Sequence, residues 1–244
     1  MKIYFREKTV ISRKIILNMS NSTTLSPSIF KFLKKIQKNN NRAWFAENKD
    51  AYLVEDAHFK AFASGLLNEM SQYDQIESMR TYRIYRDVRF SKDKTPYNSH
   101  FAMGMTRATK WLRGSYYLHI KPGASMVAGG FWGPNKEDLR RIRTEIAADA
   151  APFRKILTAP DFVENFGDLH GEQLKTAPRD YPKDHPAVDL LRYKQFLLVK
   201  NFTDEEVLSA DFLPELVATF RSMRPFLDYM SEVLTTDANG VPID

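Results

Sequence analysis

Residues 114–132, GSYYLHIKPGASMVAGGFW, decide the fold because they hold two alternating segments separated by a turn. Alternation with a period of two is typical of strands, whose side chains point in turn to opposite faces of a sheet. The dipeptide Pro122-Gly123 is a turn signal, so residues 114–121 and 124–131 are predicted to pair as an antiparallel hairpin. One face of the first strand then carries Ser115, Tyr117 and His119.

Similar alternation extends the predicted sheet to residues 81–90 and 100–106, and Leu197 and Val199 indicate a further strand. Helical patterns lie on both sides of these strands. The predicted helix signals are Ser26-Pro27 as a start, Asn41 and Asn135 as caps, Thr203 with Glu206 as a capping box, and a helical region over 213–234 broken near Pro225. We therefore expect an α+β fold, an antiparallel β-meander flanked by N-terminal and C-terminal helices.

The predicted strand at 81–90 carries an unusual density of charge. Alternation would place Arg83, Tyr85, Asp87, Arg89 and Ser91 on one face, and Tyr82, Ile84, Arg86, Val88 and Phe90 on the other. The second face is apolar except for Arg86, which needs a carboxylate partner if it is buried. The first face forms a polar cluster, and the turn that follows it is rich in polar side chains.

This polar cluster and its turn are the candidate site. Arg83, Arg89 and Lys94 are expected to bind a phosphate or carboxylate, with Ser91 and Asp93 as further ligand-binding residues. Candidate residues for orienting the ligand or exchanging protons are Asp87, Tyr97 and His119. The same cations could instead form a structural ion-pair network, and Asp93 could serve only to bond the backbone of the turn.

The motif from Arg86 to Tyr97, RDVRFSKDKTPY, resembles the signature of the domain of unknown function 2461 family. Three further blocks carry the resemblance: residues 39–49, residues 116–134, and residues 184–194. Together they extend over about residues 25 to 230. The resemblance implies membership, and it brings no activity and no catalytic residue with it.

The distribution of charge supports more than one function. The formal net charge is +6, and ten lysines and arginines against Asp87 and Asp93 make residues 80–121 basic. Residues 122–244 are acidic, so pairing within the chain is one explanation. A pocket for a small anionic ligand, with or without catalysis, is the preferred hypothesis. The alternatives are a module for single-stranded nucleic acid and a non-catalytic interaction protein.

Composition restricts the chemistry and the compartment. The chain has no cysteine, which excludes disulfides and thiolate ligands and fits a cytoplasmic location. Its five histidines show no metal-ligand spacing, so no metal site is predicted, and the sequence indicates no cofactor and no oligomeric state. No apolar run has the length of a membrane span, so no membrane association is expected.

The domain organisation predicted from the sequence is simple. Residues 19–244 are expected to form a single α+β domain, since no repeat or Gly/Ser linker divides them. Residues 1–18 have no periodic apolar face and are expected to be a disordered or mis-assigned extension, with Met19 as an alternative start to Met1.

Overall fold

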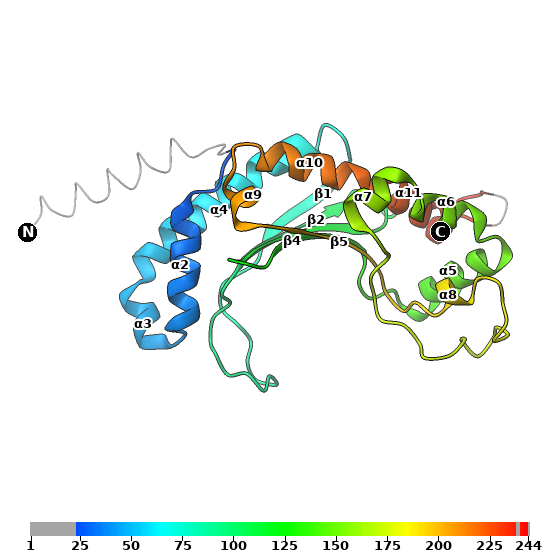
Figure 1. Ribbon diagram of the computed structural model, residues 1–244, viewed down its shortest axis with the longest axis horizontal. Coiled ribbons are helices and arrows are strands. Elements are labelled where there is room, and N and C mark those ends of the chain that lie inside the picture. The colour runs from blue at the N-terminus through cyan, green and yellow to red at the C-terminus, as the bar shows by residue number, and fades with distance from the viewer. Residues whose placement is uncertain (1–22, 238–239, 244) are drawn as a thin grey trace, which may run out of the picture.

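The computed structural model of the 244-residue chain describes residues 23–237 and 240–243 (Figure 1). The expected N-terminal extension, residues 1–18, lies outside the described residues. The strands are β1 (Ile76–Thr81), β2 (Phe101–Arg107), β3 (Ser115–Ile120), β4 (Ser125–Phe131) and β5 (Phe196–Phe202). The helices are α2 (Pro27–Lys38), α3 (Arg42–Glu47), α4 (Lys49–Met70), α5 (Lys136–Ala148), α6 (Ala151–Leu157), α7 (Pro160–Phe166), α8 (Val188–Leu191), α9 (Asp204–Leu208), α10 (Phe212–Ser222) and α11 (Arg224–Thr235).

The strands form one five-stranded sheet in the order β1-β2-β3-β4-β5. Each strand runs antiparallel to its neighbours. The β3–β4 turn contains Gly123, whose φ of 72° lies in the left-handed region that glycine tolerates. Helices α5 to α8 separate β4 from β5 in sequence, yet β5 still pairs with β4. The predicted α+β class is confirmed, with a meander between N-terminal and C-terminal helices.

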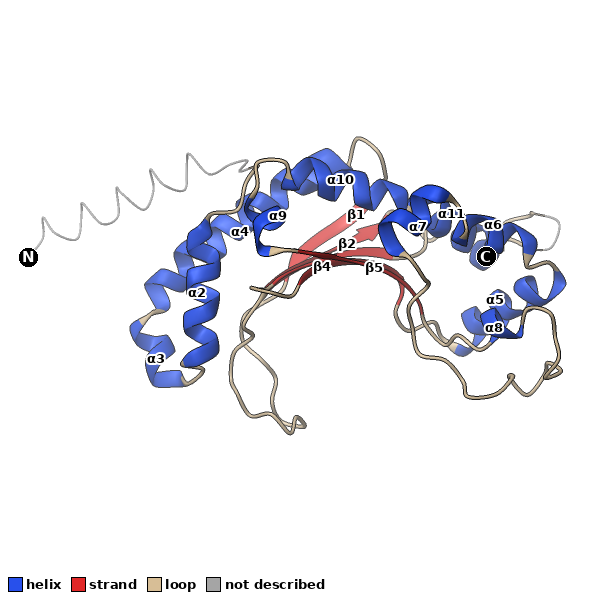
Figure 2. Ribbon diagram, viewed as in Figure 1, coloured by secondary structure: helices blue, strands red, loops and turns tan. Residues whose placement is uncertain are grey.

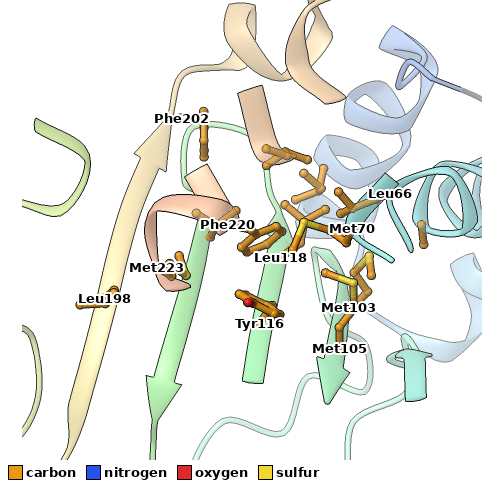
Figure 3. Close-up of a cluster of buried hydrophobic side chains, with 14 of the residues drawn as sticks. Leu66, Met70, Met103, Met105, Tyr116, Leu118, Leu198, Phe202, Phe220 and Met223 are labelled. Carbon is orange, nitrogen blue, oxygen red and sulfur yellow. The ribbon is translucent and has the colours of Figure 1, made fainter. Parts of the chain in front are cut away.

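One face of the sheet packs against helices α4, α10 and α11. Figure 3 shows Leu66 and Met70 of α4, and Phe220 and Met223 at the end of α10, meeting side chains from the strands. The strand residues labelled there are Met103, Met105, Tyr116, Leu118, Leu198 and Phe202, and all are buried. Removing this much apolar surface from water is the main force that holds the helices on the sheet.

The other face of the sheet has no helical layer. In Figures 1 and 2 the sheet bends into an arch with α4, α10 and α11 on its convex side. Helices α2 and α3 stand at one end of the arch, and α5 and α8 stand at the other. The segment 82–100, between β1 and β2, extends from the sheet on the concave side. The fold therefore leaves the concave face of the meander available for a site.

The predicted helix signals are confirmed by the caps. Asn41 accepts a hydrogen bond from the backbone amide of Trp44 at 3.0 Å. Thr203 and Glu206 form a reciprocal capping box at the start of α9. The C-terminal helical region is broken at Met223, between α10 and α11. Among the described residues, none of the helices combines the length and the apolar character that crossing a bilayer requires.

The predicted strand at 81–90 is wrong in its position and in its faces. Strand β1 occupies Ile76–Thr81, and residues 82–100 are irregular apart from one bridge between Tyr85 and Tyr97. Phe90, expected on an apolar face, is 97% exposed. Contacts within the segment override the alternating pattern, because Arg86 turns to Asp93 (2.5 Å) and bonds Thr95 instead of entering the core.

Candidate functional site

Many of the side chains on the concave face of the sheet are small. Gly104 pairs with Tyr117 across β2 and β3, and Tyr117 pairs with Ala128 on β4. Directly opposed residues of antiparallel strands project from the same face, so these three share the concave face. The next row along the strands is Thr106, Ser115, Gly130 and Leu197. Glycine, alanine and serine leave a hollow above the strands that larger residues would fill.

A cavity of about 460 Å³ occupies this hollow, and we call it the sheet cavity. Its volume falls in the range of small-molecule sites. Its lining includes Gly104, Ser115, Ala128 and Gly130 from the two rows, Arg80 and Tyr82 from the β1 side, and Trp132 beyond β4. Trp132 is 65% exposed, an unusual degree of exposure for the largest apolar ring.

A second cavity, of about 370 Å³, lies against the base of the segment 82–100, and we call it the loop cavity. It is lined by Tyr82, Arg83, Tyr85, Arg86, Asp87, Asn98, His100, Ala102 and Tyr117. Tyr82 and Tyr117 line both cavities. The two hollows are therefore neighbours along the concave face, divided by these two tyrosines.

The dividing tyrosines are held by Arg80. Its guanidinium lies 4.7 Å from the centre of the Tyr82 ring, and its Nη2 donates to the Tyr82 hydroxyl at 3.1 Å. The Tyr82 and Tyr117 rings meet edge to face, with centroids 6.0 Å apart. Gly104 permits this arrangement, because a Cβ there would come within 3.1 Å of the Tyr82 hydroxyl.

Two histidines lie behind Tyr117. The Tyr117 hydroxyl is 3.2 Å from His119 Nδ1, and the His119 ring lies 4.2 Å from that of His100. Burial, with the nearby positive charge of Lys121, lowers the pKa of each histidine to about 4. Both rings are therefore neutral near pH 7, so a neutral His119 Nδ1 can accept a hydrogen bond from the Tyr117 hydroxyl, whose pKa is raised by burial.

The cations of the concave face fall into two groups. Arg86 pairs with Asp93, and Arg89 pairs with Asp87 at 2.7 Å. Within residues 23–237 and 240–243, neither Arg80 nor Arg83 forms an ion pair, although Arg83 is near enough to lower the pKa of Asp87 slightly. Arg80 and Arg83 line the two cavities, so their charge is available to an anion.

The structure separates the residues that the sequence grouped as one site. Arg83 and Asp87 line the loop cavity, and His119 lies next to it beside His100. Among the described residues His119 and Asp87 do not bond each other, because Asp87 accepts from Arg89, which lowers the pKa of its carboxyl group.

The other predicted residues serve the segment's own fold. Arg89 is exposed, Asp93 bonds Arg86 and Thr95, and Lys94 donates to the carbonyls of Val88 and Arg89. Ser91 donates its backbone amide to Val88. Tyr97 is buried, with its ring stacked 4.0 Å from that of Phe45, and burial raises its pKa. These contacts fix the segment 82–100 beside the sheet, and a role in ligand binding for them stays a prediction.

The sequence pattern missed Arg80, His100 and Trp132 as site residues. Each lies near a strand end, where the correct register is needed to assign a face. Arg80 could have been found from its pairing opposite Gly104, had β1 been placed at Ile76–Thr81. Among the described residues, no group of three histidine, aspartate or glutamate side chains could hold a metal ion.

A buried ion-pair network on the opposite, helix-covered face of the sheet involves some of the arginines that make residues 80–121 basic. The Arg107 side chain is fully buried and donates to Asp74 at 2.7 Å and to Asp228 of α11. Tyr116 also donates to Asp74, at 2.6 Å. Arg113 pairs with Asp138 of α5 at 2.7 Å. Thus Arg107 and Arg113 each pair with an acidic residue of the C-terminal half, whereas Arg86 and Arg89 pair with carboxylates of their own segment.

The fold and the site define an α+β protein whose antiparallel meander is covered by helices on one face and hollowed on the other. A family model described as "Conserved hypothetical protein (DUF2461)" matches residues 28–229, and the chain belongs to this family. The predicted membership is confirmed. No curated protein and no solved structure matches the chain.

Proposed function

We propose that the protein binds a small anionic ligand, bearing a phosphate or carboxylate, on the concave face of its sheet. The observation that carries the proposal is the pair of neighbouring cavities lined by Arg80 and Arg83, two arginines without a carboxylate partner in the described chain. An arginine fork offers parallel hydrogen bonds to two oxygens of such a group.

Tyr117 and His119 would give this pocket a capacity for proton exchange. Tyr117 lines both cavities, and its hydroxyl is hydrogen bonded to a neutral imidazole. If the hydroxyl turned to donate to a ligand atom, the neutral His119 ring in its Nδ1–H tautomer could donate to the phenolic oxygen in exchange. In this proposal Tyr117 contacts the ligand and His119 is a positioning residue.

The test is a ligand panel measured by thermal unfolding and calorimetry. Nucleotides, sugar phosphates and organic acids are compared with sodium sulfate at matched ionic strength, because sulfate stabilises proteins by exclusion. A ligand at about 100 times its Kd should stabilise the protein by about 2.7 kcal/mol and raise Tm by a few degrees.

Three variants test whether the ligand-induced rise in Tm depends on the arginines of the two cavities. Arg80→Ala and Arg83→Ala should reduce the shift without lowering the ligand-free Tm, since both side chains are exposed. Arg140→Ala is the matched control, because Arg140 is an exposed arginine on α5 that pairs with Glu137. If no compound exceeds sulfate, or if the shift survives both cavity variants, the proposal fails.

Single-stranded nucleic acid is the second candidate. The observation in its favour is a set of exposed aromatic rings near cations: Tyr82, Tyr85, Phe90 and Trp132 are 38%, 45%, 97% and 65% exposed. Bases stack on such rings. Submicromolar binding of an oligonucleotide, with a log-log salt slope near 0.7 per neutralised phosphate, would favour this candidate over a small ligand.

A further inference from the structure

The walls of the sheet cavity differ in chemistry. Their arrangement indicates which chemical groups the ligand carries in addition to its negative charge. The floor consists of backbone and small side chains at Gly104, Ala128 and Gly130. Gly130 has a φ of 120°, and a Cβ there would lie 2.2 Å from the Phe196 carbonyl oxygen. The backbone at Gly130 therefore requires glycine, and the small residues of the floor let a ligand group approach the sheet closely.

Aromatic rings border this floor. Tyr82 and Tyr117 form one wall through their edge-to-face contact, and Trp132 contributes to the lining after the end of β4. Trp132 leaves most of its surface in contact with solvent, at 65% exposure. Exposed aromatic surface lining a cavity is favourable for stacking a planar ring, because the contact removes apolar area on both partners from water.

Two hydroxyl groups lie on the same floor without partners. Thr106 and Ser115 are paired in register across β2 and β3, and both are exposed and line the sheet cavity. Within the described residues, neither side-chain hydroxyl makes a hydrogen bond. A hydroxyl both donates and accepts, so the pair can bond the nitrogen and oxygen atoms at the edge of a heterocycle, which a hydrocarbon ring would not satisfy.

The anionic end of the ligand would lie at Arg80. This guanidinium is stacked on Tyr82 at the border of the cavity, and its remaining N–H groups are free to bond phosphate oxygens. We infer that the sheet cavity takes a heteroaromatic ring joined to a phosphate, the chemical class of a mononucleotide, with the ring over Ala128 and Gly130 and beside Tyr117. This inference rests on the proposed function and specifies its ligand.

The experiment separates the ring from the phosphate. Calorimetry at constant ionic strength compares four mononucleotides (AMP, GMP, CMP and UMP) with ribose 5-phosphate, inorganic phosphate and the four nucleosides. At least one mononucleotide should bind about tenfold or more tightly than ribose 5-phosphate, because base stacking on aromatic side chains strengthens binding by about 5- to 100-fold.

Variants then test which residues bind the ring and which bind the phosphate. Trp132→Ala should weaken the best mononucleotide by about 5- to 100-fold and leave ribose 5-phosphate unchanged, whereas Trp132→Phe should retain most of the affinity. Arg80→Ala should weaken both ligands. Trp111→Ala is the matched control, because Trp111 is also exposed, at 36%, but lines neither cavity. Quenching of tryptophan fluorescence by the mononucleotide in a Trp111→Phe background should disappear in Trp111→Phe/Trp132→Phe.

The outcomes distinguish the two proposals. If ribose 5-phosphate or another anion without a ring binds as tightly as every mononucleotide, or if Trp132→Ala has no effect, the ring inference is overturned and anion binding stands. Tighter binding of an oligonucleotide than of every mononucleotide also overturns it, in favour of a nucleic-acid surface. If no anion in this panel or in the broader ligand panel binds, the proposed function fails as well.

Discussion

His100 and His119 are expected to make the stability of the protein depend on pH between about 6.5 and 4. Burial lowers the pKa of each ring to about 4, from an ordinary value of 6.5. Protonation of either ring in the folded protein would place a charge near the other ring, Lys121 and Arg86. The unfolded chain accepts those protons at a higher pH than the folded chain does.

The sign and the size of the effect follow from this difference. Above pH 6.5 both states hold neutral histidines, and the full stability is present. Between pH 6.5 and 4 the unfolded state binds more protons, so stability falls by at most about 1.4 kcal/mol per pH unit for each ring. Both rings keep some solvent contact, and screening reduces this limit. We therefore expect the pair to account for a loss of about 2 kcal/mol across the interval.

Urea titrations at half-unit intervals from pH 7.5 to 4.5 measure this dependence. The double variant His100→Gln/His119→Gln should show a flatter profile than the wild type, whatever its stability at pH 7.5. His170→Gln is the control for replacing an exposed histidine. Parallel profiles of the double variant and the wild type would refute the reasoning, because the pH dependence would then not come from this pair.

Four further variants test the fold around the site. Arg107→Met should lower the unfolding free energy by about 3–5 kcal/mol, since it removes the buried guanidinium that bonds Asp74 and Asp228 and leaves Asp74 only the longer pair with Arg224 at 3.5 Å; an unchanged urea midpoint would refute this. Arg86→Ala should lower the unfolding free energy by only about 1 kcal/mol, which is less than the loss expected for a buried arginine. Arg89→Ala should leave Tm unchanged. Calorimetric melting of both variants checks that Arg86→Ala is the more destabilising of the two. Gly130→Ala should cost about 2 kcal/mol or more through its positive φ and its contact with a backbone carbonyl, and wild-type stability in the same melting experiment would contradict the floor geometry.

The central strands could be predicted because their signals are local. Alternation and the Pro122-Gly123 turn define β3 and β4, and capping residues define the starts of the helices. The face shared by Ser115, Tyr117 and His119 follows from the same alternation, and the register confirms it.

The segment 82–100 could not be predicted in this way, because distant residues determine its path. Asn40 bonds both the carbonyl and the amide of Tyr97, at 2.8 and 3.1 Å, across 57 positions of sequence. Stacking on Phe45 adds a second anchor. Such contacts have no local signature, so a run that alternates like a strand is held as an irregular loop.

The candidate site was missed in part for the same reason. Arg80 lines the sheet cavity because of the register in which β1 pairs with β2, and Trp132 lines it because β4 ends at Phe131. The sequence motif placed the predicted ligand site at the charged turn. In the structure, Arg89 and Lys94 of that turn mostly contact their own segment. Trp132 follows directly after β4, and its ring is exposed although tryptophan is usually largely buried.

The most direct test of the central claim is to map ligand contacts by NMR. Backbone amide shifts are recorded while the strongest anion from the panel is added, with sulfate at equal ionic strength as the reference. Binding on the concave face predicts the largest changes at Gly104, Ser115, Tyr117 and Ala128, with loss of these changes in Arg80→Ala. Changes that gather elsewhere, for example around α5 and α11, while these four amides stay unmoved would contradict a site on the concave face.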